Sequence, residues 1–324
     1  MDRISVKLLS HTPSGSKLIA VAARVSLSRK PVGDLLDMGD GEVSKWIWEL
    51  VRRSHGSPLE HASYTFLVEG CSRVCTHQLV RHRLASYTQQ SMRYTDGYIR
   101  DAALLSSERL GLGCPKSRKA PGALECYSRA LRGAAEAARA GEEWALEAAR
   151  KAFVFPPGIP QGMRGAYASG LLEAASEYYR LQASGAPMED ARYLLPQSAR
   201  TRIVFTMNAR ELLESFIPLR TCSRAQAEIR LVAWLVLQEL TTVEPEVFKY
   251  AGPRCVLEEN RIRPDPRPLK DYLEGRASFV LPRCPELVPR EGIRACLVYA
   301  SSTPKTLGAS RTPRGAPVGG GGQG

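Results

Sequence analysis

The sequence predicts an α+β fold, in which a small mixed or antiparallel sheet is flanked by long helices. Apolar and polar residues alternate at 4–8 and 62–70, and residues 201–207 are rich in β-branched and aromatic side chains; both patterns are typical of strands. Helical patterns fill much of the chain between them, with the longest at 124–153, 165–183 and 225–240. A chain of 324 residues can bury the core that such a fold needs.

Each element of the first half has a local signal. Ser14 or Ser16 can cap a helix, and apolar residues recur at helical spacing in two later segments. The predicted order is a strand at 4–8, a helix from Ser14 or Ser16 to about Val25, a helix over 43–51, a turn at 57–61, a strand at 62–70 and a helix from 72 to about 84, followed by a loop or short turn.

The second half is mainly helical. The segment 124–153 has good helix formers but modest apolar content, which suggests a surface or interface insert broken near Gly141. The helix at 225–240 is apolar on several faces, which predicts deep burial or a subunit contact. The other predicted elements are helices at 165–183, 187–195 and 208–216, the last ended by Pro218, a strand at 201–207, a proline-rich segment at 253–289, a short apolar segment at 294–299 and a disordered glycine-rich tail from 301.

The composition describes an ordinary globular protein with an excess of arginine. The formal net charge is +12, and only ten of the 45 basic residues are Lys. Arginine favours phosphate or carboxylate recognition, although base composition can also enrich it. No zinc-finger spacing, RNA-binding aromatic motif or basic heptad zipper accompanies the charge, so no nucleic-acid partner is expected. No signal peptide or membrane-length apolar run is evident, and we expect a cytoplasmic protein with no membrane partner.

The eight cysteines are scattered, and none forms a Cys-x-x-Cys pair. Their spacing predicts buried thiols, or a disulfide if the source is a hyperthermophile. No metal site is expected.

Residues 81–94 form the most distinctive stretch of the chain. No carboxylate occurs between Glu69 and Asp96, while four arginines and two histidines do: Arg73, Arg81, Arg83, Arg93, His77 and His82. Hydroxyl and amide side chains lie among the arginines, so these cations have no local anion to neutralise them. The stretch predicts a site for an external anion, with phosphate favoured; the alternative is a solvated basic surface.

Two further positions are candidates from local pattern alone. Gln78 and Arg81 lie three residues apart and can share one helix face. Glu60 and His61 precede a predicted strand, where they are either site residues or a hydrogen-bonded surface pair; the pattern favours neither.

Several ordered motifs together resemble the flavin-dependent thymidylate synthases. Arg81-His82-Arg83 is followed after seven residues by Ser91, with Ser86, Arg93 and Tyr94 also matching that family's signature. Supporting matches lie at 23–26, 58–61, 189–196, 206–212, 219–220 and 224–229. The resemblance covers residues 1–98 and 153–250 and therefore implies a catalytic domain over 1–250 with a helical insert at about 101–152, a Pro- and Cys-containing extension at 251–300 and a tail at 301–324.

The resemblance implies an enzyme in which the cofactor performs the redox chemistry and the protein binds the substrates. Members of this family are homotetramers with active sites shared between subunits, and they bind FAD. They convert dUMP to dTMP with 5,10-methylenetetrahydrofolate as carbon donor and NADPH as reductant. The cofactor then supplies the hydride chemistry, and the protein binds anions and orients rings.

Matched positions give the implied site residues. Arg220 would act in catalysis, as a fixed cation that stabilises negative charge on the uracil ring. His61 would lie near the flavin and folate face. The implied dUMP residues are Gln78, Arg81, Gln89, Gln90, Ser91, Met92, Arg93, Arg192 and Arg220. The implied FAD residues are Ser63, Arg81, His82, Arg83, Gln89, Asn208 and Arg210.

The chain departs from the family pattern at some of these positions. Thr88-Gln89 stands where Asn-Glu is frequent, and Arg224 stands where some members have His. One residue more than in many members separates Asn208 from Arg220, which leaves Glu214 or Ser215 where an amide or imidazole often contacts FAD. The alternatives to an active synthase are a basic nucleic-acid-binding protein and a catalytically degenerate paralogue.

Overall fold

A four-stranded antiparallel sheet lies at the centre of the computed structural model, which describes Met1 and residues 3–308. The strand order is β1-β2-β4-β3, with β1 at Ser5–His11, β2 at Ser63–Ser72, β4 at Arg200–Asn208 and β3 at Ala85–Gln89. Every neighbouring pair is antiparallel. The α+β class is confirmed, and the sheet in the described residues is antiparallel rather than mixed.

The strand β3 corrects the sequence-based expectation. A loop or short turn was expected after residue 84, but Ala85 pairs with Met207 and Gln89 pairs with Ile203. The preceding helix is also shorter than expected, since α4 spans Arg73–Leu79. The segment Ala-Ser-Tyr-Thr-Gln is polar because it forms an edge strand, and so it lacks the apolar signal of a buried strand.

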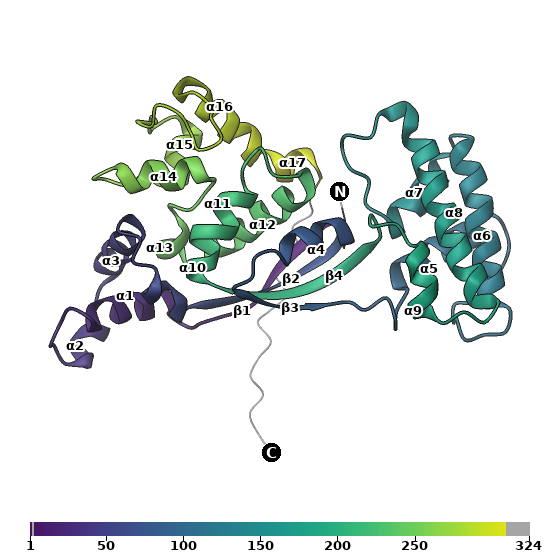
Figure 1. Ribbon diagram of the computed structural model, residues 1–324, viewed down its shortest axis with the longest axis horizontal. Helices are drawn as coiled ribbons and strands as arrows, with labels where there is room; N and C mark the ends of the chain where they lie inside the picture. Colours follow the sequence, from purple (N-terminus) through teal and green to yellow (C-terminus); the bar gives the residue numbers. More distant parts are fainter. Residues whose placement is uncertain (2, 309–324) are drawn as a thin grey trace, which may run out of the picture.

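Helices from both ends of the chain cover the sheet and share its core (Figure 1). The longest of them, α12 at Ala227–Val243, buries most of its side chains, which confirms the deep burial expected for 225–240. Glu244, which follows the last residue of α12, accepts hydrogen bonds from the backbone N–H groups of Gly15 and Ser16 and so fixes the start of α1. The remaining helices of this part are α1 at Gly15–Val25, α2 at Val32–Leu36, α3 at Asp40–Arg52, the 3-10 turn η1 at Ser57–His61, and α13 at Pro245–Phe248.

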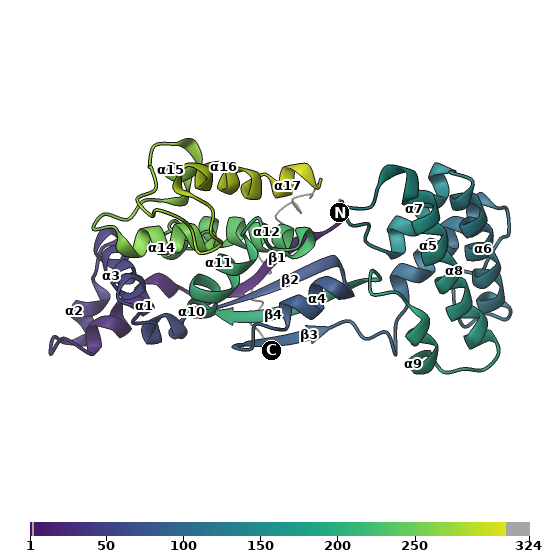
Figure 2. The ribbon, with the colours of Figure 1, turned by 45° about the horizontal axis from the view of Figure 1, so that its top comes forward.

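Four longer helices, together with the short α9 at Met188–Ala191, form a separate module at one end of the sheet (Figures 1 and 2). The longer helices are α5 at Gly97–Arg109, α6 at Ala123–Arg139, α7 at Glu143–Ala152 and α8 at Arg164–Ala183. Their own core includes Tyr127, Tyr178 and Tyr179, and α6 and α7 are separated at Gly141, which has a φ of 88°. The helical unit is thus wider than the expected insert at 101–152, because α8 packs into the same core. A disulfide joins Cys114 to Cys126 in this module, so the expectation of buried thiols is wrong for these two cysteines.

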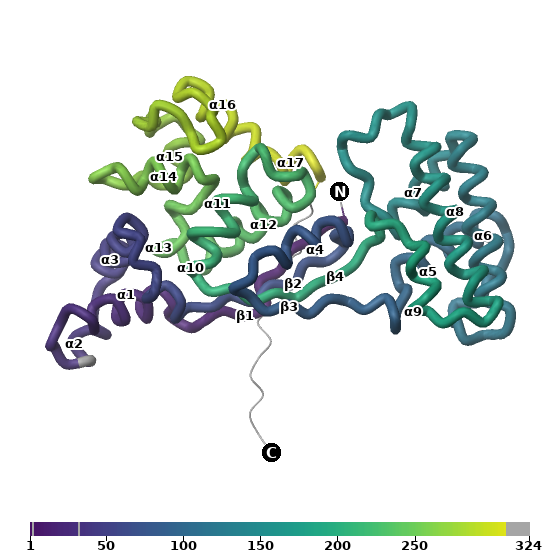
Figure 3. The backbone as a smooth tube through the Cα atoms, viewed as in Figure 1, coloured from purple at the N-terminus to yellow at the C-terminus, as the bar shows by residue number. Residues whose placement is uncertain are grey.

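The extension after residue 250 packs onto the sheet domain. Val256, Tyr272, Ile293 and Leu297 belong to the same buried core as the strands. Its helices are α14 at Arg254–Ile262, α15 at Leu269–Glu274, α16 at Arg290–Ser301 and α17 at Thr303–Thr306 (Figure 3). The short helix α17 lies within the tail that was expected to be disordered, and that expectation is wrong for 303–306. Residues 309–324 lie outside the described residues.

No helix among residues 3–308 combines the length and apolar character required to span a bilayer.

Candidate active site

The turn between α4 and β3 presents the Arg-His-Arg motif. Ser72 caps α4 by accepting a hydrogen bond from the backbone N–H of Cys75. The Tyr87 hydroxyl, on β3, lies 2.9 Å from the carbonyl oxygen of Leu79 and 2.6 Å from that of His82. Helix and strand therefore hold both ends of the turn. Arg81 and Arg83, which precede and follow His82 in the sequence, are exposed. His82 itself is buried and only 5% exposed.

A buried polar chain surrounds His82. Its Nδ1 atom lies 3.0 Å from Oε1 of Glu211 and 3.1 Å from Oγ of Ser215. On the other side of the ring, the Nε–H of Arg220 donates to Nε2 over 3.0 Å. Both ring nitrogens are thus engaged by protein groups.

Arg220 is directed at this turn without a carboxylate partner. Its second hydrogen bond goes from a terminal N–H to the carbonyl oxygen of Gln78 over 3.2 Å. Burial lowers the pKa of the Arg220 guanidinium from its ordinary value. Within residues 3–308, no carboxylate lies within ion-pair distance of Arg220 or of the exposed Arg81, Arg83 and Arg93. These side chains are therefore available to an external anion, as the anion site expected for 81–94 requires; the alternative of a solvated basic surface is not tested by these contacts.

The segment after β3 leads from the sheet to the helical module. Gln89 donates from Nε2 to the hydroxyls of Thr76 and Thr201, at 3.1 and 3.3 Å. The backbone N–H of Gln90 donates to the carbonyl oxygen of Arg202 over 2.9 Å. Ser91 accepts from the backbone N–H of Arg93 over 3.3 Å, and Met92 packs against the module core. The dUMP residues implied for 89–93 thus lie along one continuous segment.

The residues implied to contact FAD, except Gln89, lie towards the other end of the sheet. Ser63 begins β2 and pairs with Asn208 at the end of β4. Asn208 caps the following helix, α10 at Ala209–Glu211, by accepting from the backbone N–H of Glu211. Arg210 lies beside this cap, where its guanidinium contacts Glu60 over 2.6 Å and Glu214 over 3.2 Å.

His61 is exposed in η1, next to this group. Its neighbour Glu60 bonds Arg210 rather than His61, so the two residues do not form the surface pair that was one interpretation of the sequence. The side chain of His61 therefore faces solvent at the same sheet end as Ser63 and Asn208.

Arg192 lies at the far end of β4. It belongs to the short 3-10 turn η3 at Arg192–Leu194, and its positive charge helps burial to lower the pKa of Arg73, at the start of α4. β4 extends over nine residues between this end and Asn208, which corresponds to about 25 Å at strand rise. One chain thus places the implied site residues along the sheet rather than in a single pocket.

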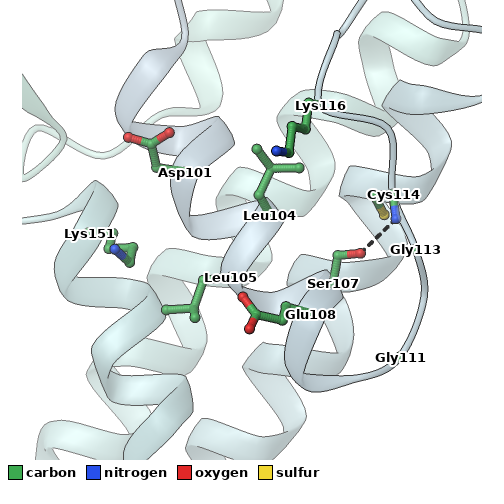
Figure 4. Close-up of a pocket in the computed structure, with 10 residues that line it drawn as sticks. All are labelled: Asp101, Leu104, Leu105, Ser107, Glu108, Gly111, Gly113, Cys114, Lys116 and Lys151. Atoms are coloured by element: carbon green, nitrogen blue, oxygen red, sulfur yellow. Dashed lines mark hydrogen bonds between the residues drawn. The ribbon is translucent and has the colours of Figure 1, made fainter.

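The defined cavities lie elsewhere. One of about 650 Å³ lies within the helical module beside Cys114, and Figure 4 shows charges of both signs around it, from Asp101, Glu108, Lys116 and Lys151. Another, of about 960 Å³, lies between α1, α3 and η1. Neither is lined by any residue that the sequence implied for dUMP or FAD.

The sequence did not predict the supporting contacts of the site. Glu211 and Ser215 bind His82, while Thr76 and Thr201 bind Gln89. Glu214 and Ser215 lie in a π-helical turn at Leu212–Phe216, which is followed by α11 at Ile217–Arg220. Pro218 lies inside this helix and does not end it, contrary to expectation. The one-residue excess between Asn208 and Arg220 could have indicated such a turn, because π-bulges accommodate an added residue within a helix.

Four free cysteines gather where the extension meets the sheet domain. Burial, reinforced by Cys284, Cys222 and Cys296, raises the pKa of Cys255 to about 12. Across the part of the chain that the structure describes, no group of three or more His, Cys, Asp or Glu side chains is arranged to hold a metal ion.

Comparison with known proteins identifies the family. The model of the thymidylate synthase complementing protein family matches residues 7–246. A flavin-dependent thymidylate synthase of Aeropyrum pernix is 53% identical over 310 residues, which cover 92% of this chain and 94% of the relative. Another, from Saccharolobus solfataricus, is 38% identical over 92% of this chain and 97% of its own length.

A solved structure supports the fold. The thymidylate synthase ThyX of Helicobacter pylori, determined with FAD and dUMP, has a TM-score of 0.53 and 22% identity, and the match covers 75% of this chain and 97% of that one. The sheet, the Arg-His-Arg turn and these matches agree: this chain belongs to the family of flavin-dependent thymidylate synthases.

Proposed function

We propose that this protein catalyses the FAD-dependent reductive methylation of dUMP to dTMP, with 5,10-methylenetetrahydrofolate as carbon donor and NADPH as reductant, in de novo dTMP synthesis in the cytoplasm. The observation that carries the proposal is the Arg-His-Arg turn, where Arg81, Arg83 and Arg220 have no carboxylate partner among residues 3–308. Relatives that share 53% and 38% of their aligned residues with this chain bear the same activity in their names.

The residues at the Asn208 end of the sheet fit FAD in their chemistry. A dinucleotide requires cations for its pyrophosphate and polar groups for its sugars and ring edges. Arg81 and Arg83 provide unpaired guanidinium groups, and Ser63 and His61 lie nearby. Arg210 is oriented by Glu60 and Glu214 and can keep one face for a ligand. When bound, the reduced flavin supplies the hydride that completes the methyl group.

The chain's own residues would bind and polarise the nucleotide. Arg81, Arg93 and Arg192 supply the charge that a phosphate requires. Gln78, Gln89, Gln90 and Ser91 supply amide and hydroxyl groups for the pyrimidine and sugar, with Met92 as an apolar contact. Arg220 is held by His82 and by the Gln78 carbonyl oxygen, so a fixed positive charge can stabilise negative charge that develops on the uracil.

The separation of these groups favours a homotetramer with shared active sites. The Asn208 and Arg192 ends of the sheet are too far apart for one nucleotide to contact both. Leu84, Tyr94 and Tyr193, beside the two groups, expose 64%, 76% and 85% of their surface. Exposed aromatic and aliphatic side chains around a binding site are typical of an interface. A second subunit that covers them would bring its own Arg192 end against the Asn208 end of the first.

Spectroscopy and isotope release test the proposal. The purified protein should be yellow, and dUMP should perturb its flavin spectrum. With the flavin-bound protein, tritium should be released from dUMP labelled at C5 when methylenetetrahydrofolate and NADPH are added, and release should fall when either is omitted or when FAD is removed. A protein that remains colourless after incubation with FAD would contradict the proposal, whereas steep salt-dependent binding of polynucleotides would favour a nucleic-acid binder. Light scattering of the holoenzyme measures its subunit number.

A further inference from the structure

The contacts of His82 determine which of its nitrogens carries the proton. The Nε atom of Arg220 lies 3.0 Å from Nε2, and a guanidinium can only donate hydrogen bonds. Nε2 must therefore accept, which leaves the proton of a neutral imidazole on Nδ1. Nδ1 in turn requires an acceptor, and the carboxylate of Glu211 lies 3.0 Å away. The Ser215 hydroxyl, at 3.1 Å, can share that role.

Because these groups are buried, the loss of one hydrogen-bond partner of His82 should disturb the others. The side chains of His82 and Glu211 are 4% and 8% exposed, so water cannot readily replace a lost partner. If the ring proton moved to Nε2, two N–H groups would face each other between His82 and Arg220, and the guanidinium would have to move.

The helix that carries these residues is shaped to bring them together. Glu211 and Arg220 are nine residues apart, and an unbroken α-helix of about 3.6 residues per turn would direct them to opposite sides. The π-helical turn at Leu212–Phe216 lies between them and takes more residues per turn, which rotates Arg220 back towards the face of Glu211. The same turn supplies Ser215.

We propose that Glu211, supported by Ser215, is a positioning residue that orients Arg220 through His82, by fixing the ring as the Nδ1–H tautomer. This inference rests on the proposed function, because it concerns the residue assigned to the uracil ring. Glu211 itself need not touch substrate or cofactor.

The first measurement is independent of catalysis. Nitrogen-15 NMR of histidine-labelled protein distinguishes the two tautomers, and a His82→Gln variant identifies the resonance among the five histidines. We expect Nδ1–H in the native protein and in Glu211→Asp, which keeps a carboxylate. In Glu211→Gln the amide can either accept from or donate to Nδ1, so the Nδ1–H tautomer should lose its preference and both tautomers should be detected. A native Nε2–H tautomer would overturn the proposal.

The second measurement follows the consequence for the substrate. Titration of the flavin spectrum should give dUMP binding that is about ten- to a hundredfold weaker in Glu211→Gln, with FAD content unchanged and Glu211→Asp intermediate. Glu244→Gln is the matched control, since it removes another buried carboxylate, at the start of α1, and should lower stability without changing dUMP binding.

These experiments distinguish failure of the positioning role of Glu211 from failure of the proposed enzymatic function. Native dUMP affinity in Glu211→Gln would overturn the positioning role. A native protein that fails to bind FAD and dUMP would instead overturn the proposed function, while the NMR result would still decide the tautomer. If Glu211→Gln does not fold, the native tautomer and the Glu211→Asp titration remain decisive.

Discussion

Ser72 and Glu228 are joined by two hydrogen bonds of 2.6 Å across 156 residues of sequence, one from the backbone N–H and one from the hydroxyl of Ser72. Ser72 caps α4, and Glu228 lies in the first turn of α12. The carboxylate therefore holds the start of the helix that leads to the Arg-His-Arg turn. Because the contact is almost fully buried, it links the protonation of Glu228 to the stability of the fold.

Glu228 should make stability depend on pH. Burial raises its pKa above the ordinary value of about 4.5. Its contribution to stability is therefore complete below pH 4.5 and is lost as the pH rises through the raised folded-state pKa. The stability of the native protein relative to Glu228→Gln should accordingly be greater at pH 4.5 than at pH 8, as measured by denaturant unfolding. A difference that is constant across this range would contradict the role given to burial.

Arg220→Ala should abolish dTMP formation while FAD remains bound. The variant loses the fixed cation, and loss of one such stabilising group lowers turnover by about a hundredfold or more. Tritium release from labelled dUMP measures turnover, and flavin absorbance measures FAD content. Arg220→Lys is the companion variant: it keeps the charge but loses the Nε–H donated to His82, and it should recover little activity. Near-normal turnover of the alanine variant would rule out the catalytic assignment.

Gly56→Ala should weaken FAD binding by displacing Arg210. A Cβ atom at Gly56 would lie 2.4 Å from Nε and 2.8 Å from Cδ of Arg210. The side chain would have to leave Glu60 and Glu214, although its flexibility keeps the loss of fold stability small. Flavin content after gel filtration is the measurement. Gly39→Ala is the control, because no atom lies within 4 Å of its added Cβ and its flavin content should match the native protein.

Removal of the Cys114–Cys126 disulfide should destabilise the helical module. The bond closes a loop with a sequence separation of 12, and loop-closure entropy gives about 3 kcal/mol for a loop of this size. Cys126→Ser should therefore melt at a lower temperature by circular dichroism. A reductant should lower the melting temperature of the native protein and leave the variant unaffected. Identical melting of the two proteins without reductant would show that the bond does not form.

The sequence predicted the elements whose signal is local. The two inner strands and the long helices were found because their apolar residues recur at strand or helix spacing. The edge strand β3 was missed because its polar sequence has no apolar alternation, so only its pairing with β4 defines it as a strand. The disulfide was not placed for a similar reason: cysteine spacing does not reveal which sulfurs meet.

The same distinction applies to the candidate site. Arg81, Arg83 and Arg220 could be named because charge patterns and ordered motifs identify groups that would meet a ligand. The contacts of Glu211 and Ser215 with His82 could not be predicted, since an acid and a hydroxyl in a helical segment look like ordinary surface residues, and Ser215 was named only for a position near FAD. Their role arises from burial against His82, 129 and 133 residues away in the sequence.

The helical module and the sheet domain have separate cores that share no buried residue among those described. A packing defect in one core therefore reaches the other only through the contacts that join them, such as the hydrogen bond from Arg200 on β4 to the carbonyl oxygen of Arg150 on α7. During evolution, the module can accumulate changes in length and composition while the sheet that carries the Arg-His-Arg turn stays intact. Selection for heat resistance and selection for turnover can then act on different parts of the same polypeptide.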